Sequence, residues 1–114
     1  MRESKWTRDF CTELTKVGCI VIPNVMGPMV RNVPDRTIIT KYGMYYVEFK
    51  GEKTEWEDGQ RILAGRINAR FPCCFLYRFP GILSINDQWV SVRDPRQFVE
   101  ELHRLCGLYM NTKP

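Results

Sequence analysis

The spacing of apolar residues along the chain changes from helical to strand-like and back, and this pattern predicts a mixed α/β fold. In residues 4–17 apolar side chains recur every three or four positions, with Ser4 placed to cap the helix and Gly18 placed just after its end. The same spacing predicts a second helix over residues 54–69 and a third over residues 94–107.

Short runs of β-branched and aromatic residues predict the strands. These runs cover residues 19–22, 35–40, 44–50, 73–79 and 88–92. The pair Tyr42-Gly43 is expected to be a two-residue turn that joins the second and third runs in a hairpin. Residues 80–87 have the Pro, Gly, Asn and Asp content of a turn-rich excursion.

Length and composition are typical of one domain that spans residues 1–114. Of the 114 residues 44% are hydrophobic, and the formal net charge of +4 permits a polyanionic partner without requiring one. The five cysteines show no C-x-x-C spacing and His103 is the only histidine, which argues against a zinc site and favours a reducing compartment. With no leader sequence and no apolar run of bilayer length, we expect a cytoplasmic protein without membrane contact.

Charged residues near the hairpin are the first candidates for chemistry. The predicted turn places Asp35 opposite Lys50 and puts Glu48 on the same face, while Phe49 points to the other face. A three-residue loop would shift this register by one residue. The alternative interpretation is a solvated sheet face that carries one cross-strand salt bridge.

Polar residues also occur within the apolar stripes of the first two helices. Glu13 lies three residues after Phe10, and Gln60 lies between Trp56 and Leu63. Each is alternatively a boundary residue whose tip reaches water. If both helices pack on the sheet, a further carboxylate and an amide converge on the hairpin charges. Because buried carboxylates repel one another, this arrangement favours a divalent cation with oxygen ligands, such as Mg²⁺.

These residues also carry a family resemblance. Pro34-Asp35, a gap of twelve residues and then Glu48-Phe49-Lys50 match the PD-(D/E)xK signature of metal-dependent nucleases. The strings "NVPDR" and "YYVEFKG", followed by Gln60, resemble the VRR-NUC domain, including its small standalone members in phages, and the resemblance covers residues 13–79. One departure is Asn32, where members usually carry glycine, although asparagine also tolerates left-handed backbone angles. The resemblance implies a restriction-endonuclease-like core, with a mixed four- to five-stranded sheet flanked by helices.

The resemblance implies a role for each site residue. Asp35 and Glu48, with the backbone carbonyl of Phe49, would bind Mg²⁺ or Mn²⁺. Lys50 would orient or deprotonate the attacking water and help neutralise the transition state. Gln60 would hold that lysine or the water.

Residues around this centre complete the functional prediction. Glu13 would support a metal-bound water or a second ion. Four basic residues would contact DNA phosphates, although any one of them is also explained as solvated surface: Arg31, Arg36, Lys53 and Arg61. The implied function is a Mg²⁺-dependent DNA endonuclease of a bacterial or phage-infected cell. Alternatives are a catalytically silent nucleic-acid-binding or assembly subunit with the same fold, and an exonuclease or nickase with the same site.

The resemblance to standalone members also suggests a homodimer that selects branched DNA such as Holliday junctions. Large apolar residues between Pro80 and Trp89 are expected in an exposed excursion, where they would form a protein contact. The alternative is that this excursion folds back and completes the core.

Overall fold

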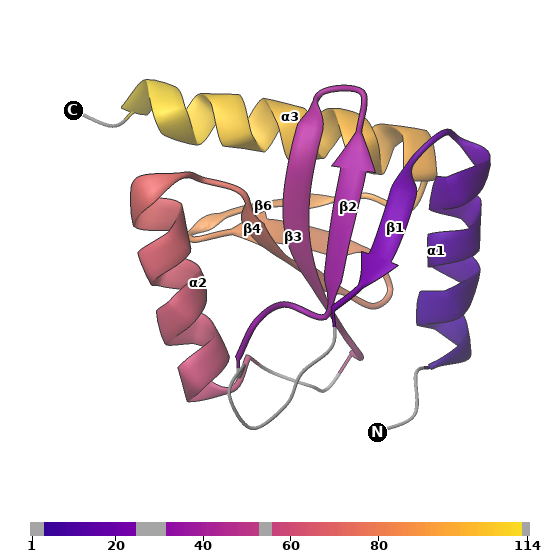
Figure 1. Ribbon diagram of the computed structural model, residues 1–114, viewed down its shortest axis with the longest axis horizontal. Helices are drawn as coiled ribbons and strands as arrows, with labels where there is room; N and C mark the ends of the chain where they lie inside the picture. The colour runs from indigo at the N-terminus through magenta and orange to yellow at the C-terminus, as the bar shows by residue number, and fades with distance from the viewer. Residues whose placement is uncertain (1–3, 25–31, 53–55, 113–114) are drawn as a thin grey trace.

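The computed structural model describes residues 4–24, 32–52 and 56–112, and in them the chain forms an α/β domain with one mixed sheet (Figure 1). The helices are α1 (Lys5–Lys16), α2 (Asp58–Arg70) and α3 (Pro95–Thr112). The strands are β1 (Ile20–Pro23), β2 (Arg36–Thr40), β3 (Gly43–Lys50), β4 (Cys74–Arg78), β5 (Ile82–Ile85) and β6 (Gln88–Ser91). No helix in the described part of the chain is both long and apolar enough to cross a membrane.

The sheet has six strands in the order β1-β2-β3-β4-β5-β6, so the expectation of four or five strands is wrong. Only β3 and β4 run parallel, and α2 provides the crossover that a parallel pair requires. The additional strand is β5, within the segment expected to be an excursion. Its residues Leu83 and Ile85 are fully buried because their side chains point into the core, while the alternate residues of the strand are less buried.

The first face of the sheet carries the aromatic core, which α1 and α3 cover. Phe10 of α1 and Phe98 of α3 both pack on Tyr77 of β4, with ring centroids 4.9 and 4.8 Å apart, and Phe49 of β3 joins them. Such aromatic residues contribute large buried areas and specific edge contacts. The third helix is confirmed, with Phe98, Leu102 and Leu105 buried as helical spacing requires, but it continues past Gly107 to Thr112.

The opposite face is partly covered by α2, at the left of Figure 1, whose buried residues are mostly polar. They are Gln60, Ala64 and Asn68. Asn68 accepts the backbone N–H groups of Cys73 and Cys74 and donates to the carbonyl of Cys74, which fixes the end of α2 to the start of β4. The helix begins at Asp58, later than predicted, because Glu57 and Gln60 form its capping box.

The hairpin turn is formed by Lys41 and Tyr42, since Thr40 pairs directly with Gly43. The expected turn at Tyr42-Gly43 is therefore wrong. The hydroxyl oxygen of Thr40 accepts the N–H groups of Tyr42 and Gly43, and the Tyr42 hydroxyl donates to Glu100 on α3. These contacts place the turn one residue earlier, so Asp35 lies beside Glu48 rather than opposite Lys50.

Candidate active site

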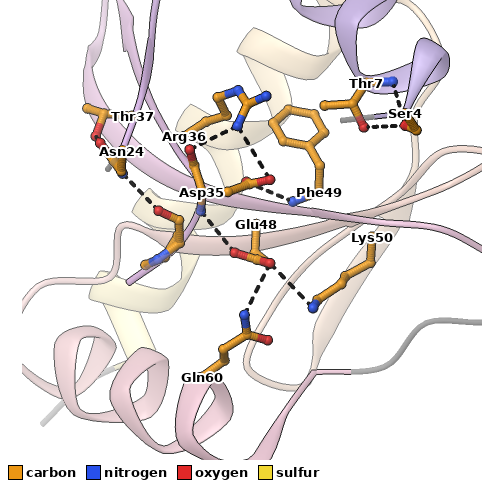
Figure 2. Close-up of polar contacts among 11 residues, drawn as sticks. Ser4, Thr7, Asn24, Asp35, Arg36, Thr37, Glu48, Phe49, Lys50 and Gln60 are labelled. Carbon is orange, nitrogen blue, oxygen red and sulfur yellow. Dashed lines mark hydrogen bonds and ion pairs between the residues drawn. The ribbon is translucent and has the colours of Figure 1, made fainter. Parts of the chain in front are cut away.

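Two carboxylates meet where β2 begins and β3 ends (Figure 2). The backbone N–H of Asp35 donates to Glu48 Oε1 at 2.9 Å, and the backbone N–H of Phe49 donates to Asp35 Oδ1 at 3.1 Å. Each carboxylate is thus held by the backbone of the other strand. The predicted clustering of Asp35, Glu48 and Lys50 is confirmed, although the register that produces it differs from the expected one.

The turn before Asp35 is fixed by its neighbours. Asn24 donates its side-chain amide to the carbonyl of Pro34 at 2.8 Å, and Asn32 has a left-handed φ of 67°. The Asn32 side chain lies against Gly59 in the first turn of α2, so closely that a Cβ on Gly59 would come within 2.6 Å of it. The departure from glycine at Asn32 therefore leaves the turn intact.

Lys50 and Gln60 converge on one oxygen of Glu48. Lys50 Nζ lies 3.4 Å from Glu48 Oε2, and Gln60 Nε2 donates to the same oxygen at 3.2 Å. The side chains of Glu48 and Lys50 are only 6% and 10% exposed. Gln60 Oε1 accepts the N–H of Glu57, so the same amide caps α2 and positions Glu48. Gln60 therefore acts on Lys50 through this shared carboxylate.

Arg36 lies closer to the carboxylates than expected for a residue at the rim of the site. Its Nη1 donates to the backbone carbonyl of Asp35 at 3.0 Å and lies 3.5 Å from Asp35 Oδ2. Its side chain is 13% exposed. By distance Arg36 is paired with Asp35 and Lys50 with Glu48, but the charge of Lys50 also acts on Asp35, and that of Glu48 on Arg36. Adjacency to Asp35 in the sequence was the only signal of this role.

Burial makes both carboxylates hold protons more tightly than exposed ones. Burial, and secondly the charge of Glu48, raise the pKa of Asp35 from 3.8 to about 7, against the N–H of Phe49 and the charge of Lys50. Burial also raises the pKa of Glu48, and the charge of Lys50 opposes this. The pair is therefore poised to gain from an additional positive charge.

The expectation that Glu13 points towards this cluster is wrong. Its side chain is 53% exposed and forms an ion pair with Lys16 at 3.2 Å. The reason is that α1 covers the aromatic face of the sheet, whereas Glu48 and Lys50 lie on the α2 face. The α1 residue on which the charge of Asp35 acts is Cys11. Burial, and secondly this charge, raise the pKa of Cys11 to about 12. No motif or spacing in the sequence indicates that Cys11 lies near Asp35.

The arrangement of oxygen donors fits a small divalent cation. The N–H of Phe49 points to Asp35, and a strand residue directs its N–H and C=O to the same edge, so its carbonyl faces the same side. Glu48 Oε2 has two partners, Lys50 and Gln60. Glu48 Oε1 and both carboxylate oxygens of Asp35 each have one partner and so retain a second lone pair for a cation. The described residues contain no group of three or more His, Cys, Asp or Glu side chains suited to a metal. Mg²⁺ needs only one or two carboxylates, with water and phosphate as the other ligands.

The other predicted DNA contacts lie around the site or outside the described residues. Arg61 is exposed on α2 and pairs with Asp58 at 3.3 Å. Arg31 and Lys53 lie outside the described residues.

Comparison of the chain with known protein families, with curated proteins and with solved structures finds no match. The features of the chain that bear on function are therefore the geometry of the Asp35 and Glu48 cluster and the motif that contains it.

Proposed function

We propose that the protein is a divalent-metal-dependent DNA endonuclease with a restriction-endonuclease-like core of the VRR-NUC type. The observation that supports this proposal is the cluster of buried Glu48 with partly buried Asp35 and Lys50, where β2 begins and β3 ends. Two adjacent carboxylates with little access to water are costly for a fold and are useful where a cation must be held.

In this proposal the residues of the chain have separate roles. Asp35, Glu48 and the Phe49 carbonyl hold Mg²⁺ or Mn²⁺, which when bound polarises the phosphodiester and lowers the pKa of water. Lys50, held by Glu48, orients the attacking water and places positive charge beside the phosphoryl oxygens, where negative charge develops. Gln60 keeps Glu48 in position.

A second candidate function, a catalytically silent DNA-binding or assembly subunit, is favoured by the cation contacts. Arg36 and Lys50 together balance the charges of Asp35 and Glu48 without any ion. This candidate predicts DNA binding that is independent of divalent ions and is never followed by cleavage.

The deciding experiment is cleavage of covalently closed circular DNA in Mg²⁺, Mn²⁺, Ca²⁺ or excess EDTA. We expect DNA cleavage in Mg²⁺ and Mn²⁺, DNA binding with little cleavage in Ca²⁺, and no cleavage in excess EDTA. Undiminished cleavage in EDTA would contradict the metal assignment. Circular DNA has no ends, so an exonuclease leaves it intact, while a nickase yields only the relaxed circle.

The proposal includes a homodimer that prefers branched DNA such as four-way junctions. A two-fold pair presents two sites to symmetry-related strands, which one small domain cannot do. The apolar contact expected between Pro80 and Trp89 is reduced in the structure, because Leu83 and Ile85 are buried while Trp89 is 68% exposed. Light scattering should give about 27 kDa, twice the 13.5 kDa of one chain. A monomer that cuts linear duplex and junctions equally would contradict this part alone.

A further inference from the structure

A hollow of about 290 Å³ lies between α1 and β1 and reaches Arg36, the first residue of β2, which contacts Asp35. Its walls are formed by Cys11, Thr12, Thr15, Val21, Pro23 and Arg36. The hollow is at the small end of the range for ligand sites, which suits one compact group rather than a whole cofactor. It adjoins the candidate active site through Arg36, which contacts Asp35.

The chemistry of the lining selects an anion. Arg36 is the only charged residue among the described residues that line the hollow. The hydroxyls of Thr12 and Thr15 donate to the carbonyls of Arg8 and Cys11 within α1, so they are not needed as donors to a ligand. A guanidinium at the base of an otherwise uncharged hollow recognises phosphate or carboxylate oxygens.

Charge balance indicates how many anions this region takes. Asp35, Glu48, Arg36 and Lys50 sum to zero formal charge when all are ionised. A bound divalent cation adds two positive charges, and a scissile phosphodiester neutralises one of them. One further phosphodiester restores neutrality, and in a partly buried cluster such compensation is worth more than at the surface.

The positions of the two cations give the second phosphate a place. Figure 2 shows Arg36 on one side of the carboxylate pair, and Lys50 with Gln60 on the other. A strand whose scissile phosphate lies at the carboxylates therefore extends from Lys50 towards Arg36.

We propose that the hollow between α1 and β1 is a subsite for the backbone phosphate next to the scissile one, bound by Arg36. This inference rests on the proposed nuclease function. It makes Arg36 a substrate-binding residue that exchanges part of its contact with Asp35 for the phosphate when the metal is held.

The test places a charge on the far wall of the hollow, away from the carboxylates. Thr15 is exposed, so Thr15→Glu and its neutral control Thr15→Gln are both accommodated on the helix surface. Both are made in a Lys50→Ala background, so that labelled DNA is not cut, and binding is measured in Mn²⁺ by fluorescence anisotropy over a range of salt concentrations. We expect Thr15→Glu to weaken binding about tenfold and Thr15→Gln to leave it within about twofold. Arg36→Gln should lower the slope of log affinity against log salt by about 0.9, the value for one lost phosphate contact.

Calorimetric titration of Mn²⁺ separates this inference from the proposed function. The Thr15 variants should bind Mn²⁺ like their parent, since they do not touch the carboxylates. Equal DNA affinities for Thr15→Glu and Thr15→Gln overturn the subsite while leaving the nuclease proposal in place. A parent that binds Mn²⁺ but no DNA overturns both.

Discussion

Over residues 47–50 both faces of strand β3 are largely buried, but burial is favourable on one face and costly on the other. Val47 and Phe49 point into the aromatic core, where burial itself is favourable. Glu48 and Lys50 alternate with them and point to the α2 face, where burial removes charged groups from water. On this second face the fold must supply partners for every charge, and it does so with Gln60, backbone N–H groups and a cation for each carboxylate.

The two faces of the sheet therefore have different roles. The aromatic face stabilises the domain whatever the protein does. The α2 face gains little stability from its charges, because replacing a buried ion pair by apolar residues is often neutral or stabilising. Under the proposed function, these charges hold a divalent cation and the phosphodiester.

The largest expected effect is on cleavage, when the charged residues of the α2 face are replaced one at a time to distinguish their roles. We expect Lys50→Ala to lower the cleavage rate about 10³-fold or more, because it removes the charge beside the developing negative oxygens. It should leave Mn²⁺ binding largely intact, whereas Asp35→Ala and Glu48→Ala should lose both. Calorimetry with Mn²⁺ beside a cleavage assay measures this. Near-normal cleavage by Lys50→Ala would contradict a catalytic role for Lys50. It would support the alternative interpretation, a sheet face that carries an ordinary salt bridge.

The next effect is a difference in the free energy of unfolding between a variant of the aromatic face and a variant of the carboxylate cluster. Phe98→Ala should lower the free energy of unfolding by about 3–5 kcal/mol, because it leaves a cavity against Phe10 and Tyr77. Asp35→Asn in metal-free buffer should change it far less, since it also removes repulsion with Glu48. Urea unfolding of both variants makes the comparison. If Asp35→Asn were as destabilising as Phe98→Ala, the polar cluster would be primarily structural.

Most of the fold was predictable because its signals are local. Ser4 caps α1 as predicted, Gly18 has a left-handed φ, and Asp94 caps α3. The exceptions depended on tertiary contacts. Strand β5 was not predicted because turn residues flank its short apolar run. The hairpin turn lies one residue earlier than predicted because the hydroxyl of Thr40 accepts a backbone N–H group of the turn.

The candidate site was predictable as far as its motif extends. Asp35, Glu48 and Lys50 come together although the expected pairing was wrong, because the register differs by two residues and so leaves them on the same face, where Gln60 meets Glu48. The position of Glu13 was not predictable in the same way. Helical spacing shows which residues of a helix face inward, but not which face of the sheet the helix covers.

The proton affinity of Asp35 gives the third effect. Its pKa in the folded protein, about 7, exceeds the ordinary 3.8, so its contribution to stability is full below about pH 4 and is lost as the pH rises through 7. In EDTA the protein should therefore lose stability between these values, and Asp35→Asn should lose less. A cation must displace that proton, so Mn²⁺ affinity should rise about tenfold per pH unit up to about pH 7. Calorimetry from pH 5 to 7 tests this, and a flat profile would place the ion elsewhere.

The smallest effect distinguishes two polar residues on the same buried stripe of α2. Gln60 holds Glu48, while Asn68, two turns later, binds only backbone groups and Asn86. We expect Gln60→Ala and Asn68→Ala each to lower the free energy of unfolding by about 1–2 kcal/mol, since each leaves buried polar groups without a partner. Only Gln60→Ala should also weaken Mn²⁺ binding, by about tenfold, because it no longer orients the carboxylate. Asn68→Ala is the matched control, of the same chemistry on the same helix face. Equal Mn²⁺ affinities in the two variants would mean that Lys50 and the backbone N–H of Asp35 position Glu48 without Gln60.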